Sequence, residues 1–102
     1  MNFELHFPTG YQIENIYDGN IDLHVICSNN DVYFATVFTI QNIQNVMTRN
    51  AESFFWATDM VIVKDLMLKT IQKAIRELIE AGYLEAALTK IGTKETVYQG
   101  NI

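Results

Sequence analysis

Two histidines lie near carboxylates at strand spacing, and these pairs are the residues best suited to chemistry. His24 follows Asp22 by two positions, and His6 follows Glu4 by two positions. Side chains two residues apart on a β-strand point to the same face. Each carboxylate could therefore orient its imidazole for general base catalysis, or help it to hold a metal ion. His24 and Asp22 form the candidate pair for a small-ligand site or an enzyme.

The sequence does not complete either kind of site. Catalysis would need a third group or a nucleophile at a suitable spacing, and zinc would need patterns such as HxH or HxxxH, which the sequence lacks. Polar residues that alternate on the exposed face of a strand give the same pattern without any function. We therefore predict no catalytic residues, no metal ligands and no cofactor, and we expect that the protein is not an enzyme.

Cys27 is the only cysteine and is expected to act as a small apolar core residue. A nucleophilic thiolate needs nearby cations to lower its pKa, and this half of the chain has almost none. A single cysteine cannot form an internal disulfide, which favours a reducing, cytoplasmic location. The five glycines are scattered and form no GxGxxG or GxxxxGK[ST] motif, so no phosphate-binding loop is expected.

The acidic residues are concentrated in the first part of the chain. The protein has 102 residues and a net charge of −5, and residues 1–63 hold seven acids but one base, Arg49. This distribution argues against nucleic acid binding, which needs clustered Lys and Arg, and it suits a basic protein partner. A solvated surface that keeps the protein soluble would show the same charge. The sequence has no membrane-length apolar run and no signal peptide, so no membrane association is expected.

Phe54, Phe55 and Trp56 are consecutive aromatic residues, and Tyr11 and Tyr33 complete an aromatic-rich group. These rings could belong to the core, to the centre of a protein interface, or to a ligand pocket. If residues 52–57 form a strand, both of its faces are apolar and both need a cover. Two or three helices are expected to cover only one face, which strengthens the interface interpretation.

An amphipathic helix at about 66–81 is the element around which the other elements are expected to pack. Its apolar residues recur at the helical period of 3.6, and its charged residues occupy the other side. Asp65 precedes the run and can cap it, and Gly82 suits the left-handed position that follows a helix. Lys73 and Glu77 are spaced for an ion pair. The apolar stripe consists of Met67, Leu68, Ile71, Ala74, Ile75, Leu78 and Ile79.

Residues 21–38 predict a β-hairpin. A two-residue turn at Asn29 and Asn30 gives a register that sorts both strands into two faces. The expected pairs on the core face, beneath the principal helix, are Cys27–Val32, Val25–Phe34, Leu23–Thr36 and Ile21–Phe38. The opposite face is mixed, and another element or a second copy of the chain could cover it. The candidate oligomer face consists of Ile26, Tyr33, Ala35 and Val37.

The order of the elements predicts an α+β fold with a single small domain at residues 1–91. We expect a largely antiparallel meander sheet of five to six strands, including strands at 11–17 and 52–57. Two shorter helices, at about 40–48 and 83–91, should pack with the principal helix on one face. Residues 92–102 should form a C-terminal tail that frays.

These features together favour a non-enzymatic protein-interaction module, such as an inhibitor or immunity-type protein for a basic partner. Asp22, Asp31 and Asp59 are expected to supply the charge, and Trp56 the anchor. The alternative is a structural homo-oligomer, for example a homodimer. A small-ligand binder or enzyme that uses His24 and Asp22 is less favoured.

Overall fold

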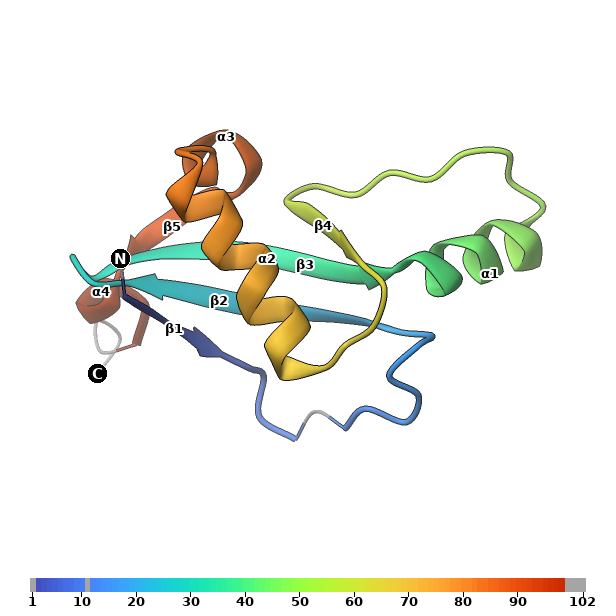
Figure 1. Ribbon diagram of the computed structural model, residues 1–102, viewed down its shortest axis with the longest axis horizontal. Coiled ribbons are helices and arrows are strands. Elements are labelled where there is room, and N and C mark those ends of the chain that lie inside the picture. Colours follow the sequence, from blue (N-terminus) through green and yellow to red (C-terminus); the bar gives the residue numbers. More distant parts are fainter. Residues whose placement is uncertain (1, 11, 99–102) are drawn as a thin grey trace.

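A mixed sheet of five strands forms the centre of the computed structural model, which describes residues 2–10 and 12–98 (Figure 1). β1, β2 and β3 are antiparallel neighbours in chain order, as expected for a meander. The remaining two strands share the far edge of β3, where β5 is antiparallel and β4 is parallel. The α+β class is confirmed, but the sheet is mixed. The strands are β1 (Phe3–His6), β2 (Asn20–Cys27), β3 (Asp31–Thr39), β4 (Met60–Val63) and β5 (Thr89–Thr93).

β4 is parallel to β3 because the chain leaves β3 through α1 (Ile40–Asn50) and a long loop before it returns (Figure 1). Parallel neighbours need such a crossover connection, whereas a tight turn would give an antiparallel pair. Residues 52–57, expected as a strand, are the irregular part of this loop. The strand expected at 11–17 is also wrong, since residues 12–17 are irregular. Tyr11 lies outside the described residues.

The β2–β3 hairpin forms, but its register differs by one residue from the expected one. Val25 pairs with Tyr33, where the sequence suggested Phe34. The connection has three residues, 28–30, because Asn30 adopts a left-handed φ of 73° and donates its N–H to the Cys27 carbonyl at 2.9 Å. Three-residue loops whose last residue is left-handed are common in hairpins. Compared with a two-residue turn, such a loop shifts the pairing of the two strands by one residue.

This shift moves every β3 side chain to the other face of the sheet. Phe34 and Phe38 were expected in the core face and instead lie on the opposite face. Their places are taken by Tyr33, Ala35 and Val37, all of which are buried in the core cluster. The residues of β2 on the core face are those expected: Ile21, Leu23, Val25 and Cys27.

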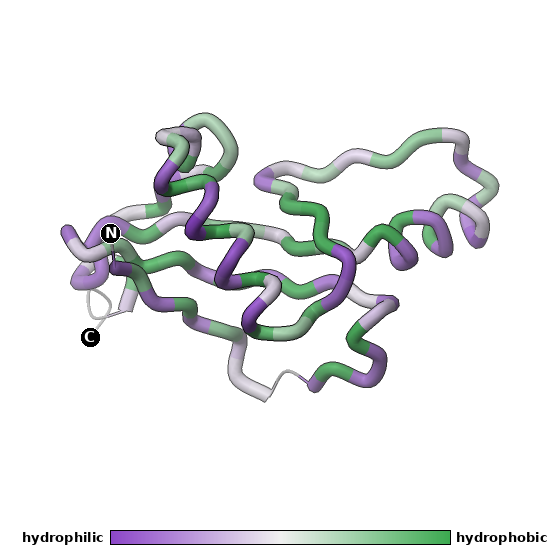
Figure 2. Tube along the Cα trace, in the orientation of Figure 1, coloured by the Kyte–Doolittle hydropathy of each residue, from purple (hydrophilic) through white to green (hydrophobic). Residues whose placement is uncertain are grey.

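The principal helix is confirmed as α2 (Leu68–Glu80), which lies across one face of the sheet (Figure 1). Hydrophilic and hydrophobic segments alternate along α2 in Figure 2, as its amphipathic pattern predicts. Ile71 and Ile75 are buried against the sheet, whereas Leu68 is exposed. The short α3 (Leu84–Ala87) extends the cover with Leu84. The helix expected at 83–91 is therefore shorter, and the chain continues directly into β5.

The chain turns into α2 at Asp65, which is buried and accepts a hydrogen bond from the Met67 N–H at 3.0 Å. A hydrogen bond from Thr70 is the main cause that holds the pKa of Asp65 below its usual value. Asp65 thus fixes the turn that leads into the helix. The expected Lys73–Glu77 ion pair does not form within 4.0 Å.

The helices do not all lie on one face, which corrects the expectation. α1 continues outward from the end of β3 and buries no residue completely (Figure 1). α4 (Lys94–Tyr98) contacts the face opposite α2 through Tyr98. Residues 92–98, expected in a tail, thus belong to β5 and α4, and 99–102 lie outside the described residues. No helix in the described ranges is long and apolar enough to cross a membrane.

Candidate functional site

The base of α1 is fixed by Thr39, the last residue of β3, which is completely buried. Its hydroxyl oxygen accepts hydrogen bonds from the N–H groups of Asn42, at 3.1 Å, and Gly19, at 3.2 Å. Thr39 is thus both the N-cap of α1 and a link to the segment before β2. Asp18 of that segment also accepts hydrogen bonds from the side chains of Asn42 and Asn45. These hydrogen bonds fix the orientation of α1 relative to the sheet, although none of its residues is buried.

The loop after α1 places consecutive aromatic rings on different sides. Phe55 packs edge-on against Phe38, with ring centroids 4.9 Å apart. Its neighbours Phe54 and Trp56 are 63% and 71% exposed. The loop ends at Asp59, whose carbonyl accepts from the Thr36 N–H at 2.9 Å. Contacts at both ends and at Phe55 therefore fix a loop that presents two aromatic side chains to solvent.

We call α1 and residues 51–59 the aromatic arm. Ile40, at the start of the arm, and Ile62, on the adjoining β4, are also large apolar residues that are more than half exposed. Four large apolar side chains between residues 40 and 62 are thus more than half exposed: Ile40, Phe54, Trp56 and Ile62. Of the three interpretations of the aromatic group, Phe55 belongs to the packed structure, and Phe54 and Trp56 form an exposed surface.

The three candidate aspartates are divided between two regions. Asp22 of β2 is exposed and pairs with Thr36 of β3. Asp59 precedes β4, which lies on the other side of β3, and its carbonyl is hydrogen-bonded to the same Thr36. The Asp59 carboxylate also accepts from the Thr89 hydroxyl at 2.8 Å. Asp31 lies at the other end of β3, in a 3.2 Å ion pair with Lys90. Asp22 and Asp59 can thus act together near the aromatic arm, and Asp31 cannot.

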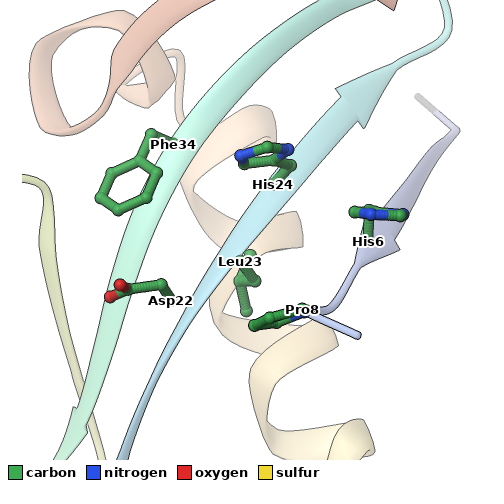
Figure 3. Close-up of a pocket in the computed structure, with 6 residues that line it drawn as sticks. All are labelled: His6, Pro8, Asp22, Leu23, His24 and Phe34. Carbon is green, nitrogen blue, oxygen red and sulfur yellow. The ribbon is translucent and has the colours of Figure 1, made fainter. Parts of the chain in front are cut away.

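His24 and Asp22 do share one face, as the strand period predicts, and both line a pocket of about 240 Å³ on the face opposite α2 (Figure 3). His6 also lines this pocket, and its ring stacks on that of His24 with centroids 5.9 Å apart. Phe34 of β3 lies beside His24 at the pocket wall. Among the described residues, no group of three His, Cys, Asp or Glu side chains could hold a metal ion.

Tyr98 of α4 closes one side of this histidine pair, a contact that the sequence did not predict. The Tyr98 hydroxyl is hydrogen-bonded to His24 Nδ1. The pKa of His24 is lowered, mainly by burial and then by the neighbouring His6. The pKa of Tyr98 is raised, mainly by burial and then by Glu4. The hydrogen bond between Tyr98 and His24, together with the contact between the Tyr98 and His6 rings, holds α4 on the sheet.

The segment expected to form a tail does contain a sequence signal for α4. The N–H of Thr93 donates to the Thr96 hydroxyl at 2.9 Å, and the Thr96 N–H donates to the Thr93 hydroxyl at 3.4 Å. This reciprocal pair resembles a capping box, in which residues three apart satisfy each other's N–H groups at a helix start. The T-x-x-T spacing could thus have indicated a helix start.

We predict that the protein loses stability as the pH falls below about 6.5, the ordinary pKa of histidine. The unfolded chain gains a proton on His24 near that pH, and the folded chain gains it only at lower pH, so acid favours the unfolded state. Urea denaturation between pH 8 and pH 5 measures the effect. The His24→Gln variant should have a shallower pH dependence, and an unchanged slope in that variant would contradict the prediction.

The other candidate residues lie in the interior. Cys27 is buried, and burial, followed by the nearby Asp31, raises the pKa of its thiol, which disfavours the thiolate. Tyr33, Ala35 and Val37, three of the four candidate oligomer-face residues, are covered by the helices of the same chain. Their burial follows from the register shift. The fourth, Ile26, is buried on the opposite face.

No protein-family model, no curated protein and no solved structure matches this chain.

Proposed function

We propose that this protein is a non-enzymatic protein-interaction module for a basic partner, for example an inhibitor or immunity-type protein. The observation that supports this proposal most directly is the exposure of Phe54 and Trp56 on an arm with a fixed base. Neighbouring exposed apolar side chains are uncommon on the surface of a monomer unless they serve an interaction. Trp in particular is enriched among the residues that dominate binding energies.

The fixed geometry of the arm supports the same proposal. Binding is weakened by the conformational entropy that flexible groups lose, so a surface held in place before binding loses less. The capped helix, the Asp18 contacts and the Phe38–Phe55 packing all hold the arm before any partner binds. The aromatic side chains are therefore presented in a defined arrangement.

Carboxylates around the arm favour a basic partner. Asp22 and Asp59 lie on either side of Thr36, and both Asp59 and Glu52 belong to the arm itself. Adjacent strands are about 4.8 Å apart, so the Cα atoms of Asp22 and Asp59 are separated by roughly 10 Å. Such a distribution accelerates association with a positively charged protein and disfavours acidic ones. We assign the charge function to Asp22 and Asp59, because Asp31 is neutralised by Lys90.

A pull-down from an extract of the source cell at low and high salt tests this proposal. The wild-type protein should retain a basic partner at low salt and lose most of it at high salt, since salt screens exposed charges. With the partner purified, Trp56→Ala should weaken binding by about 30-fold or more, which corresponds to the roughly 2 kcal/mol of a binding hot spot. Asp22→Lys should weaken binding mainly at low salt.

Leu68→Ala is the matched control, because Leu68 is also an exposed apolar residue but lies at the start of α2. This variant should bind like the wild type. Equal binding by the Trp56→Ala variant would contradict the proposal. Light scattering that shows a dimer, combined with no captured partner, would favour the homo-oligomer alternative.

A further inference from the structure

The outer edge of β4 has hydrogen-bonding groups that the sheet does not use. Within the described part of the chain, β4 pairs with β3 alone. The Thr36 N–H donates to the Asp59 carbonyl, and in a parallel ladder every second residue of a strand bonds to the same neighbour. Val61 continues that series toward β3. Met60 and Ile62 therefore direct their N–H and C=O groups toward the open edge.

A groove of about 400 Å³ lies beside this edge, between β4 and the helices α2 and α3. Its lining is almost entirely apolar, and it includes Val61, Leu78 and Tyr83. Among the described residues, Glu77 is the only charged one that lines it. No cation among the described residues lies within 4.0 Å of the Glu77 carboxylate. The groove thus combines an apolar wall with one carboxylate that has no ion-pair partner in the described chain.

We propose that β4 is a strand-addition site, at which an extended segment of the basic partner extends the sheet. The segment hydrogen-bonds to Met60 and Ile62, and it places one Lys or Arg side chain in the groove. The aliphatic part of that side chain packs on the apolar wall, and its cationic end reaches Glu77. The next side chain of the segment points to the other face, where Ile62 is exposed. This inference rests on the proposed function, and it specifies how the partner binds.

The occupant is a basic segment and not a second copy of β4. The strand β4 of a second copy would offer the sequence Met-Val-Ile-Val at this edge, and this sequence contains no cation for Glu77. Asp59, at the start of β4, adds a second carboxylate close to the edge. The edge also follows directly after the loop that presents Trp56, so one partner can contact both surfaces (Figure 1).

Amide hydrogen exchange, measured by NMR on the complete protein, tests the inference. The probe is an acetylated and amidated heptapeptide of alternating Val and Lys, and the control is the same peptide with Glu in place of Lys. We expect the Lys peptide to slow exchange at the Met60 and Ile62 amides by about tenfold or more, and to leave Val61 unchanged. No slowing at Met60 and Ile62, or equal slowing by the Glu peptide, would overturn the inference.

Ile62→Pro and Ile62→Thr form a matched pair for this edge. Proline is tolerated on an edge strand where the lost N–H faces solvent, so Ile62→Pro removes an outward donor and keeps the ladder to β3. It should abolish binding of the Lys peptide, whereas Ile62→Thr keeps the donor and should retain binding. Glu77→Gln should weaken binding of the Lys peptide. If Ile62→Pro does not fold, the exchange experiment on the wild type decides alone.

The outcomes separate this inference from the proposed function. If the partner requires Trp56 but binds the folded Ile62→Pro variant normally, strand addition is wrong and the proposed function stands. If Met60 and Ile62 become protected in the concentrated protein without peptide, a second copy occupies the edge and the inference is overturned. If the extract yields no partner but the Lys peptide protects both amides, the strand-addition site is supported and the proposed function is not.

Discussion

The Ile71→Asp variant is expected to be unfolded at room temperature. Ile71 is 1% exposed and packs in the core between α2 and the sheet. Removal of a buried Ile side chain costs about 2–5 kcal/mol, and burial of an unpaired carboxylate costs several kcal/mol more. The sum is comparable to the 5–15 kcal/mol that stabilises a typical domain. The helix could relieve the carboxylate only by detaching from the sheet, which would expose the core.

Far-ultraviolet circular dichroism and urea denaturation check this result. Leu68→Asp is the matched control, since Leu68 belongs to the same helix but is 53% exposed. A negative charge in the first turn of a helix is favourable, so this variant should stay within about 0.5 kcal/mol of the wild type. A cooperative unfolding transition for Ile71→Asp near that of the wild type would show that the face of α2 is not buried.

The Thr39→Val variant should destabilise the protein by about 2–4 kcal/mol and release the aromatic arm. Valine has nearly the same shape, so the change removes the hydroxyl and little packing. It leaves the N–H groups of Asn42 and Gly19 without their acceptor. An unsatisfied buried donor costs about 1–3 kcal/mol, and loss of an N-cap costs about 0.5–2 kcal/mol. The first turn of α1 should therefore fray before the rest of the domain unfolds.

Urea denaturation measures the stability of this variant, and amide exchange measures the opening of α1. Thr48→Val is the control, because it makes the same change at an exposed position of the same helix. It should change the free energy of unfolding by less than about 0.5 kcal/mol. If Thr39→Val has as small an effect, the hydroxyl does not have the role that we assign to it. If the proposed function is correct, Thr39→Val should also weaken partner binding.

The sequence predicted those features that depend on residues close together in the chain. The period of 3.6 located α2 and its buried Ile71 and Ile75, and the period of 2 placed Asp22 and His24 on one face. The burial of Cys27 followed from the alternation in β2. These patterns are local, because each follows from the geometry of a single helix or strand.

The sequence did not predict features that depend on how distant segments meet. The left-handed conformation of Asn30 added one residue to the hairpin loop, and that residue moved the β3 side chains to the opposite faces. Residues 52–57, expected as a strand, instead lie in the loop that follows α1 in the crossover connection from β3 to β4. The positions of Tyr98 on His24 and of Lys90 on Asp31 also depended on contacts between segments far apart in sequence.

The proposed interaction surface also depends partly on sequence and partly on tertiary structure. Composition identified Trp56 and the acidic residues, because residue type alone indicates which side chains suit a protein interface. The tertiary structure decided that Phe55 packs inward, that Trp56 is exposed, and that β4 has an open edge. Exposure and an unpaired edge depend on which segments are neighbours. Loop conformations decide which segments, far apart in the sequence, lie side by side, and so does the choice of apolar side chains that fill the core. Neither follows from local periodicity.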